Sequence, residues 1–146
     1  ESANEGANES TNAAPPAADL WLGDSLGEMP AYYAAARVAL LGASFAPLGG
    51  QNLIEAAACA CPVVMGPHTF NFAQAAESAQ AAGAALRAPD MPAALAAALT
   101  LARDEAAHGR AAQAALALIA AHRGAADRTA EAVLTLMDEG QRQTPP

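Results

Sequence analysis

One stretch of this sequence joins a glycine loop to the predicted start of a helix: Gly49-Gly50-Gln51-Asn52-Leu53-Ile54-Glu55. Two adjacent glycines allow positive φ and let the backbone approach another group closely. Asn52 is a preferred N-cap residue, and Glu55 stands three positions later, where a carboxylate reaches back to free backbone N–H groups. The stretch therefore predicts a helix that begins at Asn52 and continues through Ala60.

The chemistry of this helix start has two interpretations. A glycine loop that leads into a helix N-terminus presents unpaired N–H groups and the positive end of the helix dipole, which favours a bound phosphate. Asn52 and Glu55 are also consistent with capping alone, and glycine pairs commonly form ordinary turns. The stretch by itself leaves both interpretations open.

Strands and helices alternate on both sides of the stretch. Short apolar runs predict strands at 20–22, 37–42, 62–66 and 84–88, with helices between them that end near Ala36, Ala60 and Ala82. Three further helices are expected at 92–103, 104–121 and 125–137. This order is typical of the α/β class, with a parallel Rossmann-like sheet flanked by helices and followed by C-terminal helices.

Such a sheet places a ligand beside the carboxyl ends of its strands. The loops that follow Leu22, Gly42 and Met65 should therefore share one edge. These loops contain Gly27-Glu28, residues 49–55 and residues 66–71, which together hold most of the glycine, amide and carboxylate groups outside the polar tails. We therefore expect a functional edge there.

Composition limits the classes of function. The 146 residues suffice for one domain, and a chain that is 53% hydrophobic but only 4% aromatic predicts a core of small side chains, mainly alanine. Seven arginines face fifteen acidic residues, and the net charge of -8 argues against a general nucleic-acid binder. One bound nucleotide remains compatible with this charge, because backbone N–H dipoles hold phosphate locally. No apolar run approaches the roughly 20 residues of a membrane span, so we expect a soluble chain.

Few side chains suggest catalysis. Glu28 either contacts a ligand from its helix start or only favours the helix dipole, and His68 in its turn suits a structural role better than that of a base. The sequence offers no convincing Ser-His-Asp set, metal-ligand cluster, dinucleotide fingerprint or P-loop. We therefore assign no catalytic residue and no metal to this chain.

Three segments carry a family resemblance: Gly23-Asp24-Ser25-Leu26-Gly27-Glu28-Met29, Gly49 through Ala56, and Pro62 through Phe72 with its run GPHTFNF. In order and spacing they resemble the C-terminal domain of the 3-deoxy-D-manno-octulosonic acid (Kdo) transferases. The resemblance covers roughly residues 19–137. It implies a CMP-sugar-binding Rossmann-like domain at 19–138 that is part of a GT-B C-terminal domain. The polar, proline-containing ends predict a disordered tail or loop at 1–18 and a disordered tail at 139–146.

The resemblance implies a glycosyltransferase of lipopolysaccharide biosynthesis. Enzymes of this family transfer Kdo from its CMP-activated donor to a lipid A precursor, at the cytoplasmic side of the bacterial inner membrane. Their two Rossmann-like domains face each other across a cleft, and they need no cofactor besides the donor substrate CMP-Kdo. The general base, the acceptor pocket and the membrane surface belong to the N-terminal domain, so we expect this fragment to be inactive alone.

The resemblance also assigns the donor site. Leu26, Gly27 and Glu28 would contact the nucleotide from the first loop. Asn52, Leu53, Ile54 and Glu55 would contact it from the second loop, where the Glu55 carboxylate would accept hydrogen bonds from the ribose hydroxyls.

The chain departs from the family at two positions, where Gln51 replaces the usual histidine and Leu53 the usual proline. Gln51 keeps hydrogen-bonding capacity but cannot titrate, and Leu53 gives up the preset φ of proline at a helix start. Two alternatives remain: a nucleotide-sugar epimerase of similar two-domain shape that binds a UDP-sugar, or a non-catalytic domain that has lost its ligand.

Overall fold

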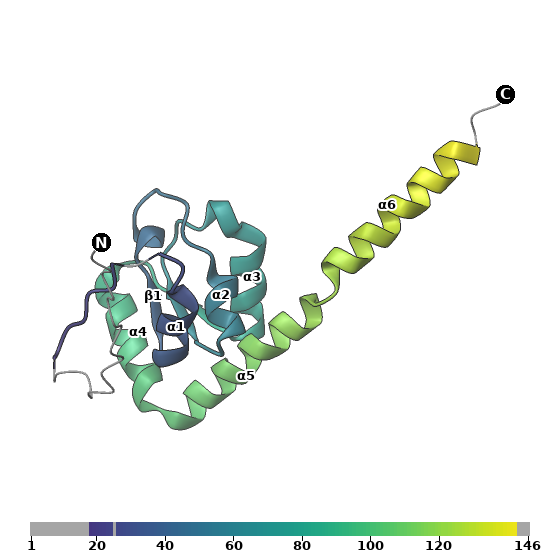
Figure 1. The fold of residues 1–146 in the computed structure, drawn as a ribbon. Coiled ribbons are helices and arrows are strands. Elements are labelled where there is room, and N and C mark those ends of the chain that lie inside the picture. The colour runs from purple at the N-terminus through teal and green to yellow at the C-terminus, as the bar shows by residue number, and fades with distance from the viewer. Residues whose placement is uncertain (1–17, 25, 143–146) are drawn as a thin grey trace, which may run out of the picture.

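The computed structural model describes residues 18–24 and 26–142, without the side chains of 125–128 and 138–142. Figure 1 shows a body of helices around a small sheet, from which the last helix projects. The elements follow in the order α1 (Met29–Ala35), β1 (Ala39–Leu41), η1 (Gly42–Phe45), α2 (Leu53–Ala58), β2 (Val63–Met65), η2 (Phe70–Phe72), α3 (Ala73–Ala82), β3 (Ala85–Arg87), α4 (Met91–Arg103), α5 (Glu105–His122) and α6 (Ala125–Arg142), where η marks a 3₁₀ helix.

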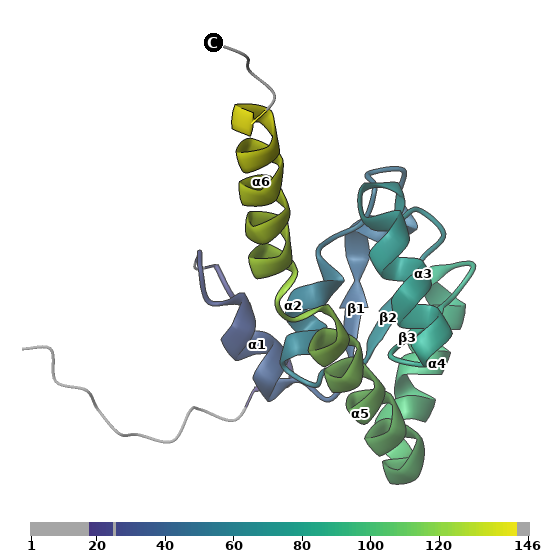
Figure 2. The same cartoon turned by 90° about the vertical axis from the view of Figure 1, so that its right-hand side faces the viewer.

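The sheet is parallel, with the strand order β1-β2-β3, and Figure 2 shows the strands side by side. Val64 of the central strand pairs with Leu40 and Leu86. Successive residues of β2 face opposite sides: Val63 and Met65 join the core under α2, α3 and α5, whereas Val64 packs with Ala94 of α4. The predicted α/β class with a parallel sheet flanked by helices is confirmed.

Small side chains form much of the core, as composition predicts. Ala56, Ala76, Ala79 and Ala94 are at most 1% exposed, and they let the helices approach the sheet closely. Capping residues delimit these helices where the sequence places them. Asp90 and Asp104 accept hydrogen bonds from the N–H groups three residues later, at 2.8 and 2.9 Å, and Gly83 ends α3 in the left-handed conformation with φ 78°.

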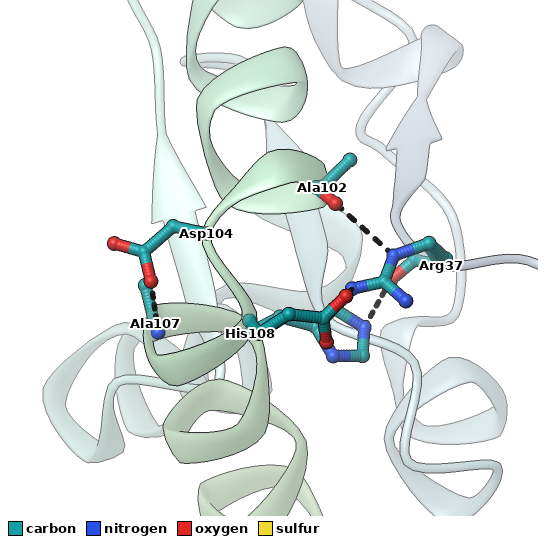
Figure 3. Close-up of polar contacts among 6 residues, drawn as sticks. Arg37, Ala102, Asp104, Ala107 and His108 are labelled. Atoms are coloured by element: carbon teal, nitrogen blue, oxygen red, sulfur yellow. Dashed lines mark hydrogen bonds and ion pairs between the residues drawn. The ribbon is translucent and has the colours of Figure 1, made fainter.

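The junction of α4 and α5 is tied to the entrance of β1 (Figure 3). The Arg37 Nε donates to the carbonyl of Ala102 at 3.1 Å, and its Nη2 lies 3.0 Å from the Glu105 carboxylate. The His108 Nε2 lies 2.8 Å from the Arg37 carbonyl oxygen. α5 packs on α2, α3 and α4, and this course brings the His108 ring to the backbone at Arg37.

The predicted strand at 20–22 is also wrong. Leu20 and Leu22 are 88% and 89% exposed, and this segment pairs with no described strand. A strand needs the backbone of a neighbour, and an apolar run of three residues does not supply one. The described sheet therefore has three strands. Leu40 of β1 is 36% exposed, since β1 lies at the sheet edge.

Helix boundaries differ slightly from the prediction. α2 ends at Ala58 rather than Ala60, which adopts a positive φ of 55°. α6 runs to Arg142, beyond the expected end at Met137, and Figures 1 and 2 show it leading away from the body. Across residues 18–24 and 26–142, no helix is both long enough and apolar enough to cross a membrane. Nearly all of the predicted tail at 1–18, and residues 143–146, lie outside the described residues.

Candidate functional site

The loops that follow β1 and β2 lie against each other at the carboxyl edge of the sheet. The Asn71 N–H donates to the carbonyl of Gly49 at 3.1 Å, and the Asn71 side-chain amide donates to the carbonyl of Leu48 at 3.2 Å. Gly49 has φ 90°, and a Cβ at this position would collide with the Asn71 side chain. The prediction that these two loops share one edge is confirmed.

Gly50 brings the backbone of the loop after β1 onto the loop after β2. Its φ is 83°, and a Cβ here would stand 3.2 Å from the His68 carbonyl oxygen and 3.4 Å from the Thr69 Cα. Contacts in the range of 3.0–3.4 Å are tighter than almost all real Cβ contacts, so the neighbouring turn would have to move. The glycine pair therefore serves both a left-handed conformation and a close approach.

Asn52 opens α2 as the sequence predicts. Its Oδ1 accepts from the Ile54 N–H at 3.1 Å. Its side-chain amide donates to Glu55 Oε1 at 3.0 Å, so Glu55 contacts the side chain of Asn52 where we expected it to reach a backbone N–H. The carboxylate orients the amide, which in turn points its oxygen at the helix.

Leu53 and Ile54, the other two residues expected to contact the nucleotide from the 49–55 loop, differ in exposure. Leu53 is 1% exposed and belongs to the core, so it offers a ligand only its backbone, whereas Ile54 is 39% exposed. The preset φ of proline that Leu53 lacks is compensated here by the N-cap of Asn52 and by burial of the leucine side chain.

The first loop occupies a different place. Leu26 is fully exposed, and Gly27 has φ 85° with no atom within 4 Å of a Cβ built there. Glu28 precedes α1, and its carboxylate accepts from the Tyr32 hydroxyl at 3.1 Å. The next turn leads to Pro30, whose carbonyl lies 3.5 Å from the Cys59 Sγ at the C-terminal end of α2. Since residues 20–22 form no strand, this loop follows no strand of the described sheet, and the helix α1 that it precedes contacts the C-terminal end of α2 through Pro30.

Tyr33 connects α1 with the second loop. It is 7% exposed in the core between α1 and α2. Burial raises the pKa of the Tyr33 hydroxyl, and the negative charge of Glu55 raises it further. Among the described residues, no group of three His, Cys, Asp or Glu side chains could hold a metal ion.

Comparison with known proteins finds relatives of one kind. It is 59% identical over 118 residues to the 3-deoxy-D-manno-octulosonic acid transferase of Bordetella pertussis, a match that covers 81% of this chain and 28% of that protein. This chain is homologous to part of the 3-deoxy-D-manno-octulosonic acid transferases. The transferase of Haemophilus influenzae is 41% identical over 71 residues, which cover 49% of this chain and 15% of that protein. No family model matches the sequence.

A solved structure supports the same assignment. The C-terminal CMP-Kdo binding domain of WaaA from Acinetobacter baumannii aligns with a TM-score of 0.61 and 31% identity, over 66% of this chain and 51% of that chain. The likeness extends to sequence as well as fold, so the predicted resemblance to the Kdo transferases is confirmed. The chain spans about a quarter of the length of the Bordetella transferase.

Sequence reasoning missed two residues that shape this edge of the transferase homologue. Ser44 is fully buried; its Oγ donates to the Leu41 carbonyl and accepts from the Gly66 N–H at 2.7 Å. Arg87 donates through Nη1 to the carbonyl of Gly66 at 2.9 Å. A serine shortly after the end of β1 was a usable signal, but the contact of Arg87 with Gly66 joins residues 21 apart and left no local pattern.

Proposed function

We propose that this chain is the CMP-binding part of a glycosyltransferase that moves Kdo from CMP-Kdo to a lipid A precursor in lipopolysaccharide biosynthesis. The observation that carries the proposal is the 59% identity to a Kdo transferase, joined by a structural neighbour that is a CMP-Kdo binding domain. The epimerase alternative is not favoured by these comparisons. The arrangement of the two glycines and the α2 start is compatible with a bound nucleotide.

In this proposal the second loop holds the nucleotide. The carboxylate of Glu55 is exposed and uses Oε1 for Asn52, while Oε2 has no hydrogen bond with any residue of the described part of the chain. It accepts hydrogen bonds from the ribose hydroxyls of CMP. Asn52, Leu53 and Ile54 contribute backbone groups at the start of α2, where N–H dipoles favour the phosphate.

Leu26, Gly27 and Glu28 complete the proposed site from the first loop. The open space around Gly27 leaves room for a ligand group beside the backbone. The proposal requires this loop to reach the nucleotide from the α1 side of α2, since α1 packs on α2.

The proposed reaction is a direct displacement at the anomeric carbon of Kdo. A general base outside these 146 residues takes the proton of the acceptor hydroxyl, the new glycosidic bond forms, and CMP leaves with the bonding electrons. The chain described here contributes the leaving-group half, because its N–H groups stabilise charge that develops on the phosphate. The acceptor site and the association with the inner membrane reside in the remainder of the enzyme, and this chain alone is inactive.

Calorimetric titration of the 146-residue chain with CMP and with UDP tests the proposal. We expect binding of CMP and a clear preference over UDP. Glu55→Ala should weaken CMP binding about 10- to 100-fold, as expected for loss of hydrogen bonds to a charged group. Glu131→Ala, an exposed acidic residue of α6, is the matched control and should bind like wild type. A preference for UDP would favour the epimerase, and equal CMP binding by the Glu55 variant would refute the proposed site.

A further inference from the structure

Arg87 reaches from the end of β3 over the turn that follows β2. Its backbone pairs with Met65, the last residue of β2, so both strands end at the same level. Nη1 donates to the carbonyls of Gly66 at 2.9 Å and Pro67 at 3.5 Å and to the Thr69 Oγ1 at 3.2 Å. One guanidinium nitrogen thus gathers three oxygens of a single turn.

The guanidinium is itself held in place. Its Nε donates to Gln80 Oε1 on α3 at 3.1 Å, so the planar group is fixed between α3 and the turn. This fork geometry is specific to arginine, since a lysine ammonium cannot present Nε and Nη1 donors at a fixed angle.

The turn that Arg87 holds is the support of the glycine loop. Thr69 is only 8% exposed, and the backbone at His68 and Thr69 is the surface against which Gly50 lies. Gly50 stands two residues before Asn52, the N-cap of α2. A displacement of the turn would therefore be transmitted through Gly50 to the start of α2.

We propose that Arg87 is a positioning residue for the nucleotide site: it fixes the 66–69 turn, and through Gly50 it sets the backbone at the start of α2. The inference rests on the proposed function for its effect on CMP. Arg87 also lines a hollow of about 440 Å³ beside Phe70 and Glu77. Its Nη1 and Nε are bound to protein oxygens, and these bonds assign it support of the turn.

The test compares Arg87→Ala and Arg87→Lys with Arg103→Ala, an exposed arginine at the end of α4. In ¹⁵N-labelled protein, Arg87→Ala should shift the amide resonances of Gly49 and Gly50, and Arg103→Ala should leave them unmoved. Arg87→Ala should weaken CMP binding about 3- to 30-fold, in the range of indirect coupling. Arg87→Lys should restore only part of the affinity.

Two readouts separate this inference from the proposed function. Failure of wild type to bind CMP would refute the proposed function, and the glycine resonances would still report whether Arg87 supports the loop. Normal CMP affinity and unshifted glycine resonances in folded Arg87→Ala would overturn the inference. If Arg87→Ala does not fold, Thr69→Val removes one acceptor of Arg87 with nearly the same shape. Thr69→Val should also shift the Gly49 and Gly50 resonances and weaken CMP binding. If it changes neither, the inference is equally overturned.

Discussion

Gly49→Ala tests the junction of the two loops. Gly49 has φ 90°, and a left-handed conformation costs an alanine about 1–2 kcal/mol. The new Cβ would also displace the Asn71 side-chain amide, which donates to the Leu48 carbonyl at 3.2 Å. Loss of that hydrogen bond adds about 0.5–1.5 kcal/mol. We therefore expect the free energy of unfolding to fall by about 1.5–3.5 kcal/mol.

Urea unfolding followed by far-ultraviolet circular dichroism measures this free energy. Gly42→Ala is the matched control, because Gly42 lacks a positive φ and a Cβ there meets no atom within 4 Å. Its effect should stay within about 0.5 kcal/mol. In the Asn71→Ala background the collision is absent, so Gly49→Ala should cost only the conformational part, about 1–2 kcal/mol. Equal urea midpoints for Gly49→Ala and Gly42→Ala would refute the reasoning.

Three further predictions concern the core, a helix and the alkaline range. Leu53→Ala should lower the free energy of unfolding by about 2–5 kcal/mol, whereas Leu26→Ala, at an exposed position, should change it by less than about 0.5 kcal/mol in the same urea assay. Gly109→Ala should raise the thermal midpoint, since it lies inside α5 with free space for a Cβ and gains about 0.5–1 kcal/mol of helix propensity; a fall would contradict this. Burial and the charge of Glu55 raise the pKa of the Tyr33 hydroxyl in the folded state. Its contribution to the free energy of unfolding is therefore complete below about pH 10 and is lost as the pH rises through the folded-state pKa. Tyr33→Phe should therefore flatten the decline of the unfolding free energy above about pH 10, and an unchanged slope would exclude this role.

Much of the architecture was predictable from local signals. Asn52 and Gly83 mark helix ends through hydrogen bonds and dihedral angles that lie within a few residues, and the structure places both as expected. The apolar run 62–66 predicts a strand, and the structure has one at Val63–Met65, which is buried because the central strand of a parallel sheet is covered on both faces. The proximity of the loops after β1 and β2 then follows from the parallel order alone.

The donor-site residues were assigned through family motifs rather than through local chemistry. Capping and phosphate binding call for the same residues at a helix start, so Asn52 and Glu55 were ambiguous by themselves. Their role in CMP binding stays a prediction. The structure adds that Leu53 is core and that Glu55 is held by Asn52.

The sequence alone determined the class of the fold, the capped helix ends and the resemblance to the Kdo transferases, because periodicity, caps and motifs are written in neighbouring residues. Only the tertiary structure decided that residues 20–22 form no strand, that Leu40 is partly exposed at an edge, and that Arg87 supports the turn after β2. These outcomes depend on which backbone or side chain lies opposite in space. Partners far apart in the chain leave no mark on the local pattern that a sequence presents.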